Sequence, residues 1–141
     1  MTYTKRPGLV GSYMLRCGEY QQLMIGRQAE MYTKAERKQL RQLAEIAYER
    51  ELALELTRLQ TRFSAWQRGE IDPFQLSETI HAFHQGPSRA LYSYYNQIDP
   101  PLAVARAVVE KLLQENEIPA GVQQKLAAAI AFYRAEQEEN G

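Results

Sequence analysis

Both histidines of this 141-residue chain lie in one short segment, together with a carboxylate. Glu78 and His81 are three residues apart, so a helix would present them on one face, and this spacing is used by carboxylate-bridged di-metal sites in helical bundles. Such a site needs a second motif with its own histidine, and His84 lies about 60° from His81 on the same helix. A metal site at Glu78, His81 and His84 is therefore a weak alternative to two hydrogen-bonded histidines at a helix end, and we expect no cofactor.

Residues for covalent catalysis are scarce. Cys17 is the single cysteine, no serine lies in a Gly-x-Ser-x-Gly elbow, and no glycine-rich phosphate loop is present. The carboxylates are distributed as ordinary charged helix faces. We therefore expect a protein that is not an enzyme.

Residues 73–97 read as helix, glycine-containing turn and short helix, which is the order of a helix-turn-helix unit. The second helix would display Arg89, Tyr92 and Asn96, which can hydrogen-bond to bases or phosphates. However, Pro87 follows the glycine directly, and the chain is neutral overall, with 17 basic and 17 acidic residues. Because nucleic-acid affinity depends on clustered cations, a DNA-associated regulator is the second choice here and nucleic acid is a disfavoured partner.

The same segment is rich in aromatic residues. Three tyrosines within four positions, Tyr92, Tyr94 and Tyr95, cannot all face the core of one helix, so at least one should be exposed. Exposed tyrosine beside arginine is typical of protein-binding hot spots, although a core that uses tyrosine at its rim accounts for the pattern equally well. The candidate partner-binding residues are Phe74, His81, His84, Arg89, Tyr92, Tyr95 and Asn96.

A single helix from Thr33 to Arg68 must position much of the chain. Thr33 and Glu36 form a capping-box pattern, no Gly or Pro interrupts residues 34–68, and Gly69 suits the position after the helix end. At 1.5 Å per residue this helix would be about 54 Å long, so it should extend beyond a compact bundle.

The long helix carries two apolar stripes. The second stripe alternates steps of four and three residues between Leu52 and Trp66, as a coiled-coil seam does, but over only about two heptads. We expect packing within the chain to cover it, with a homodimer seam as the alternative. The first stripe comprises Leu40, Leu43, Ala44, Ala47 and Leu54, and the second comprises Tyr48, Leu52, Leu56, Leu59, Phe63 and Trp66.

Four shorter helices are predicted after the long one. The first starts at the Asp72–Pro73 cap, ends near His84 or Gln85 at Gly86–Pro87, and buries Leu76, Ile80 and Phe83. Further helices are expected over 89–97, capped by Ser88, over 102–116 and over 119–138. No segment alternates as a strand does. The fold class is therefore all-α, a long N-terminal spine helix with about four shorter helices packed as an irregular bundle.

Residues 1–30 differ from the rest, because they combine Pro7 and four glycines with no sustained apolar period. We expect an irregular or flexible extension there, with a short helix near 19–24, and a single helical domain over 31–141. Met31 precedes the capping box, so one hypothesis is that the folded protein begins there and the extension is dispensable.

No apolar run approaches the roughly 20 residues that span a bilayer. A lone cysteine is compatible with a reducing compartment, so we expect a soluble, cytoplasmic protein without a membrane partner. Nine basic and five acidic residues in 1–50, against eight and twelve in 51–141, make the chain a charge dipole of +4 and −4. The leading hypothesis is a small helical module that binds a protein partner, with homodimerisation as one form of that binding.

Overall fold

The computed structural model describes residues 31–141, and the expectations for residues 1–30 lie outside this range. Within it the chain is helical and contains no strand, which confirms the all-α prediction with a long spine helix first. The elements are α2 (Lys34–Gln67), α3 (Pro73–Phe83), a π-helix η1 (His84–Ser88), α4 (Arg89–Gln97), α5 (Pro100–Val109), a 3₁₀-helix η2 (Glu115–Glu117) and α6 (Ala120–Glu139).

Local chemistry sets both ends of α2. The backbone N–H of Glu36 donates to Thr33 Oγ1 at 3.1 Å, and the Thr33 N–H donates to Glu36 Oε2 at 2.8 Å, so the predicted capping box is confirmed. Gly69 has φ of 77°, a conformation that glycine adopts without steric cost. The chain then turns, and α3 starts at the predicted Asp72–Pro73 cap, where Asp72 and Gln75 form a second capping box.

The predicted stop at Gly86–Pro87 is wrong. α3, η1 and α4 follow one another without a break, and Ser88 has helical angles (φ −59°, ψ −50°) and makes no side-chain cap hydrogen bond. Proline lacks the N–H that a helix interior requires and its ring crowds the preceding turn, and a π-helical turn accommodates both by widening the backbone locally. Residues 73–97 are therefore one rod with a bulge, and the helix-turn-helix geometry that supported DNA binding is absent.

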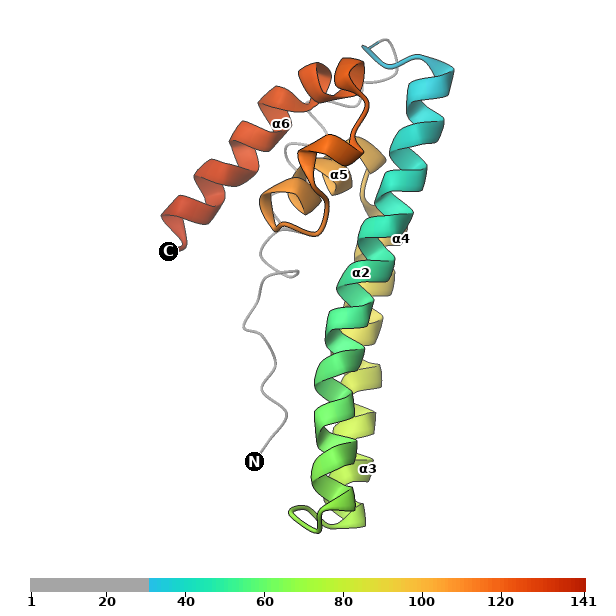
Figure 1. Ribbon diagram of the computed structural model, residues 1–141, viewed down its shortest axis with the longest axis vertical. Coiled ribbons are helices and arrows are strands. Elements are labelled where there is room, and N and C mark those ends of the chain that lie inside the picture. The colour runs from blue at the N-terminus through green and yellow to red at the C-terminus, as the bar shows by residue number, and fades with distance from the viewer. Residues whose placement is uncertain (1–30) are drawn as a thin grey trace.

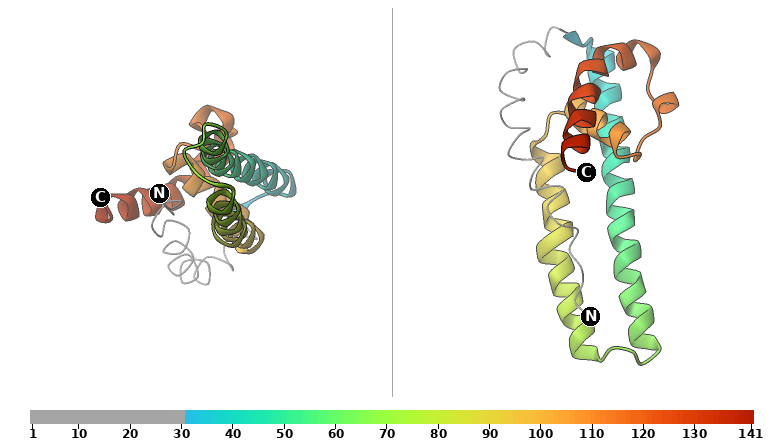
Figure 2. Two further views of the ribbon diagram at one scale, coloured as in Figure 1. Left: turned by 90° about the horizontal axis from the view of Figure 1, so that it is seen from below. Right: turned by 90° about the vertical axis from the view of Figure 1, so that its left-hand side faces the viewer.

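This rod runs antiparallel to α2 and forms a long helical hairpin with it (Figure 1 and the right view of Figure 2). The turn of the hairpin, residues 68–72, lies at one end of the molecule. The head, which we define as α5, η2 and α6 packed on the N-terminal half of α2, lies at the other end. The C-terminal half of α2 and the whole of α3 project beyond the head.

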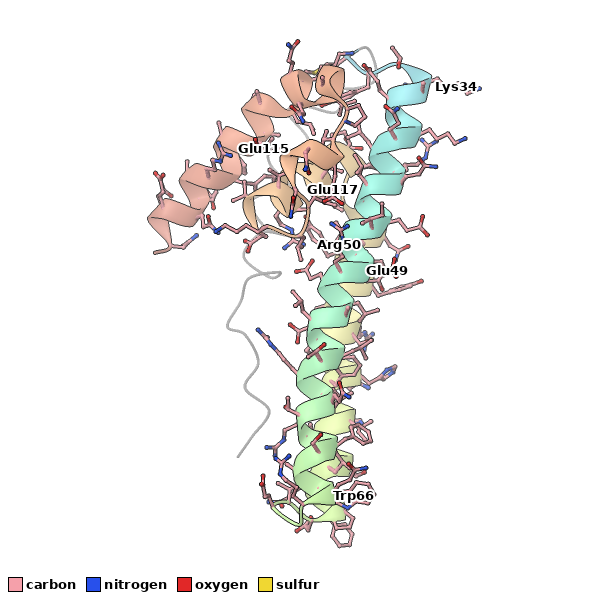
Figure 3. All side chains as sticks on the ribbon, in the orientation of Figure 1. Lys34, Glu49, Arg50, Trp66, Glu115 and Glu117 are labelled. Carbon is pink, nitrogen blue, oxygen red and sulfur yellow. The ribbon has the colours of Figure 1, made fainter. Side chains whose placement is uncertain are left out.

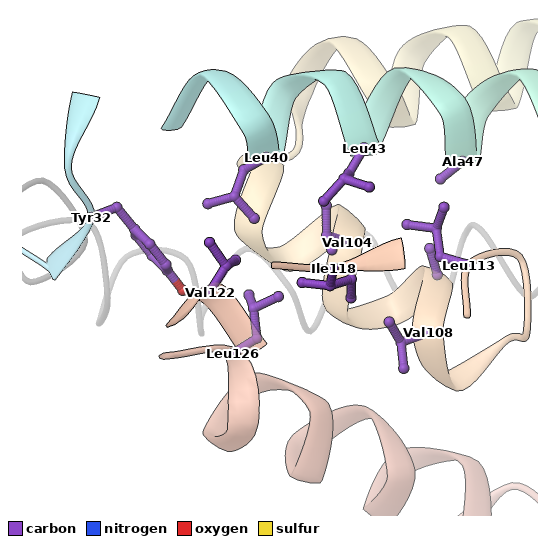
Figure 4. Close-up of a cluster of buried hydrophobic side chains, with 11 residues drawn as sticks. Tyr32, Leu40, Leu43, Ala47, Val104, Val108, Leu113, Ile118, Val122 and Leu126 are labelled. Carbon is purple, nitrogen blue, oxygen red and sulfur yellow. The ribbon is translucent and has the colours of Figure 1, made fainter. Parts of the chain in front are cut away.

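The main core lies inside the head (Figure 4). α5 is its centre, because every residue from Pro101 to Val109 is buried. From the predicted first stripe of α2, Leu40, Leu43 and Ala47 are buried against it, as expected. Leu54 is 50% exposed instead, because it lies beyond the region that the head covers.

α5 also ends earlier than predicted. It stops at Val109 instead of continuing to 116, and Lys111 takes a left-handed conformation with φ of 61°. The N–H groups of Leu112 and Leu113 then both donate to the Ala107 carbonyl, at 2.8 and 3.2 Å. This turn brings Leu113 into the core, where burial outweighs the helix propensity of a segment without Gly or Pro.

Candidate interaction surface

The projecting part of the hairpin has a small core of its own. Near the turn, a cluster of Ala65, Ile71 and Leu76 is buried, and Leu59 and Thr79 are buried further along. In the described part of the chain, α3 packs on α2 and on its own continuation through η1, with no comparable contact to α5 or α6. This half of the hairpin therefore presents most of its surface to solvent.

The second apolar stripe of α2 is only partly covered. Leu59 is buried, but Leu56, Phe63 and Trp66 are 46%, 38% and 40% exposed. A row of buried or partly buried positions in this half is centred roughly 80° around α2 from the stripe. The row comprises Glu55, Arg58, Leu59, Arg62 and Ala65. Among the described residues, the prediction that packing within the chain covers the stripe is thus wrong for half of its six residues.

α3 adds to the same side of the hairpin. Ile80, predicted to be in the core, is 40% exposed, and Thr79 is buried in its place with its hydroxyl donating to the Gln75 carbonyl at 2.9 Å. On α3, Ile80 is rotated around the helix axis away from the residues that face α2. On α2, the stripe is rotated away from the residues that face α3, and the two rotations have the same sense. Because the two helices are antiparallel, equal senses of displacement place the residues on one side of the hairpin.

We call this side the uncharged face. Figure 3 shows Trp66 near the turn of the hairpin, on the side of α2 opposite to α6. The face comprises Leu52, Leu56, Phe63 and Trp66 of α2, Ser77, Ile80 and His84 of α3 and η1, and Tyr92 of α4 at its edge.

None of these residues is Asp, Glu, Lys or Arg, and the residues that flank them on the side of α2 away from α3 are Ala53, Gln60 and Gln67. The charged residues of the same segments occupy other positions. Glu55, Arg58 and Arg62 lie toward the covered side of α2, where Arg58 pairs with Glu55 at 3.1 Å. Depletion of charge together with enrichment in aromatic residues is the composition of an interface core.

The residues proposed from sequence as partner-binding do not form one surface. Phe74, His81 and Arg89 lie on the outer side of the rod, away from α2, and Phe74 is 82% exposed. His84 lies on the uncharged face. Tyr92 lies at its edge and is 62% exposed, which confirms that at least one of the three tyrosines is exposed. Asn96 donates from Nδ2 to the Tyr92 carbonyl at 2.7 Å.

Tyr95 has a structural role instead. Its hydroxyl donates to Glu51 Oε2 at 2.7 Å, and its ring stacks on Tyr48 with centroids 4.7 Å apart. Tyr94 is buried beside it, edge-on at 4.9 Å. These contacts join α4 to α2 at the head end of the hairpin.

A buried arginine completes this cluster. The guanidinium of Arg106 donates from Nε to the Tyr94 hydroxyl at 2.9 Å and from Nη2 to the Tyr95 hydroxyl at 3.1 Å, and it pairs with both oxygens of Glu51. Sequence reasoning missed this group. The available signal was one arginine within an otherwise apolar helix, because an arginine there must be paired when the helix is buried.

The electrostatics of the cluster keep its protons in place. Burial alone would lower the pKa of Arg106, but the Tyr94 and Tyr95 oxygens and the Glu51 carboxylate raise it, and the net pKa is well above its usual range. Burial also raises the pKa of the Tyr95 phenol far above its ordinary value. Arg106 therefore stays charged and Tyr95 stays a hydrogen-bond donor over the physiological pH range.

A hollow of about 380 Å³ lies at the head end of the hairpin, next to this cluster. Its walls combine α2 and α4 with the start of α5, and they are polar at Arg41, Glu45 and Asn96. The complete lining is Arg41, Ala44, Glu45, Tyr48, Tyr95, Asn96, Ile98 and Pro100. Charged residues thus begin where the uncharged face ends.

Glu78, His81 and His84 do not converge on a metal site. Among residues 31–141, no group of three or more His, Cys, Asp or Glu side chains is arranged to hold a metal ion.

In the same range, every helix is too short or too polar to cross a bilayer. Comparison of the chain with protein-family models, with curated proteins and with solved structures yields no match.

Proposed function

We propose that this protein is a binding module whose projecting hairpin docks an apolar, uncharged helical face of another protein chain. The observation that carries the proposal is the uncharged face, where apolar side chains from two antiparallel helices lie together with no Asp, Glu, Lys or Arg among them. Contiguous apolar surface of this kind is uncommon on proteins that act as monomers.

Docking would bury apolar surface that the hairpin by itself leaves exposed, and this burial would stabilise the complex. Fully burying a Leu, Ile or Phe side chain contributes about 1.5–3 kcal/mol, so covering a half-exposed one contributes about 1 kcal/mol. Leu56, Phe63, Trp66 and Ile80 each have this much surface left to bury. Two helices side by side also form a shallow groove that matches the ridge of a partner helix.

The hairpin is well anchored for such a role. At the head end, the Arg106–Glu51 pair and the Tyr48–Tyr95 stack hold α2, α4 and α5 together. Two helices already joined in register at one end lose less conformational entropy on docking than two separate helices would. The lone Cys17 fits a reducing compartment, and we place this binding in the cytoplasm as part of the same proposal.

Two neighbouring leucines provide a matched test. Leu56 lies on the uncharged face, whereas Leu54 is on the same helix, similarly exposed at 50%, and about 160° away. A photo-crosslinking amino acid at position 56 of the full chain, expressed in the native cells, should give one discrete adduct whose linked peptide is an amphipathic helical segment. The same group at position 54 should not give it.

A second substitution checks that the adduct depends on the whole face. Ile80→Lys, on the other helix of the hairpin, should abolish the adduct from position 56. An adduct that forms equally well from position 54, or that survives Ile80→Lys, would overturn the proposal, as would the absence of any adduct from position 56.

A further inference from the structure

We infer that the partner on the uncharged face is a second copy of this chain, with the two hairpins packed face to face as a four-helix bundle. The inference rests on the proposed function and names its partner. The juxtaposition that carries it is the stripe of Leu52, Leu56, Phe63 and Trp66 beside Ile80 on the adjoining helix.

The charge pattern favours a copy of the same chain. In a two-fold dimer the same patch faces itself, so a charge near the axis meets a charge of its own sign. Such like-charge contacts are unfavourable, and a face without Asp, Glu, Lys or Arg avoids them. A partner of a different sequence would impose no such requirement, and charges of one sign on this face could then serve for recognition.

The area is sufficient for a stable dimer. From the turn of the hairpin to Tyr92 the face is about 30 Å long at 1.5 Å per residue, and two adjacent helices make it about 18–20 Å wide. Two such faces in contact would bury on the order of 1,200–1,600 Å² of accessible surface in total. This range is that of specific protein–protein interfaces.

The head does not block this packing. α6 lies on the opposite side of α2 from Trp66, so a second hairpin can approach the face along its length (Figure 3). Four-helix bundles pack helices about 20° from parallel around apolar positions that repeat in steps of three and four. The α2 stripe has these steps at 52, 56, 59, 63 and 66.

Sedimentation equilibrium of the full chain tests the inference. The monomer mass is 16.3 kDa, and the wild type should sediment at twice this value at micromolar concentrations. Leu56→Glu should weaken self-association at least 100-fold, because it places a carboxylate in the dry centre of the interface. The matched Leu54→Glu should remain a dimer with the wild-type dissociation constant.

Ile80→Lys, on the second helix, serves as an independent face variant should Leu56→Glu fail to fold, and far-UV circular dichroism checks both. A wild-type monomer at 100 µM, a dimer that persists in both face variants, or equal dissociation of Leu54→Glu and Leu56→Glu would each overturn the inference.

The photo-crosslink at position 56 separates this inference from the function on which it rests. An adduct at twice the chain mass supports both. If the wild type is a monomer, an adduct to a different protein leaves the binding function standing and overturns the second copy. An internal crosslink to residues 1–30 also overturns the second copy. The absence of any adduct overturns both.

Discussion

Arg106 of α5 and Glu51 of α2 form a two-pronged ion pair in which Nη2 to Oε2 measures 2.5 Å and Nη1 to Oε1 measures 3.3 Å. The Arg106 side chain is only 2% exposed, and 55 residues of chain separate the partners. Two tyrosine hydroxyls complete the hydrogen bonding of the guanidinium. This pair is a buried polar link between the hairpin and the head, in addition to the more exposed pairs Arg50–Glu117 and Lys125–Glu36.

Removing one partner of this pair should be costly. Glu51→Ala would leave Arg106 charged and buried without its carboxylate, which typically destabilises a protein by about 3–5 kcal/mol. The midpoint and slope of urea denaturation measure this loss. Glu49→Ala, two residues away and exposed, is the control, and a change above about 0.5 kcal/mol is not expected there. Equal effects of the two substitutions would contradict the structural role of the pair.

The ion pair between Arg50 and Glu117 should give stability a pH dependence. Hydrogen bonds from Arg50 at 2.7 and 2.9 Å, followed by one from the Gln114 N–H, lower the pKa of Glu117 to about 2. Figure 3 shows the two labelled residues beside each other at the junction of α2 and η2. In unfolded chains a glutamate has a pKa of about 4.3.

Because the folded pKa is the lower one, the stabilisation from Glu117 is complete above about pH 4.3 and is lost as the pH falls toward 2. Urea midpoints measured across this window should fall less steeply for Glu117→Gln than for the wild type. Arg50→Gln should reduce the slope similarly, since Arg50 is the main cause of the shift. An unchanged slope in both variants would contradict the assignment.

Gly69, just after the end of α2, and Gly86, inside η1, should respond oppositely to alanine. Gly86 lies in η1 with no atom within 4 Å of an added Cβ and without a positive φ, so Gly86→Ala should stabilise the protein by about 0.5–1 kcal/mol. Gly69 has φ of 77°, so Gly69→Ala should destabilise it by about 1–2 kcal/mol. Thermal melting compares them, and destabilisation by Gly86→Ala would instead indicate a true turn at Gly86–Pro87.

Hydrogen exchange should distinguish the hairpin from the head. Amides of residues 52–67 and 73–83 should exchange faster than those of α5 in dilute protein, because few buried contacts hold the projecting hairpin. Their protection should rise with protein concentration as a second copy covers the uncharged face, while the protection of α5 stays the same. Exchange in the hairpin that does not depend on concentration would argue against self-association.

The sequence by itself determined the elements whose signals are local. Capping boxes at Thr33 and Asp72 and the glycine at 69 act through neighbouring backbone groups, so the long helix, the turn and the start of α3 follow from residue type and spacing. The all-α class follows in the same way from helix formers and the absence of alternating segments. The expectation that one of three adjacent tyrosines is exposed depends only on helical periodicity.

Only the tertiary structure decided the features that depend on which segments meet. Gly86–Pro87 is a strong stop signal in isolation, yet packing of both flanking segments on α2 keeps the rod continuous through a π-helical turn. Likewise, the apolar stripe from Leu52 to Trp66 is evident in the sequence, but its rotation away from α3 is not. The contact between two helices depends on all their side chains together, so only the assembled hairpin decides which residues of that stripe stay exposed.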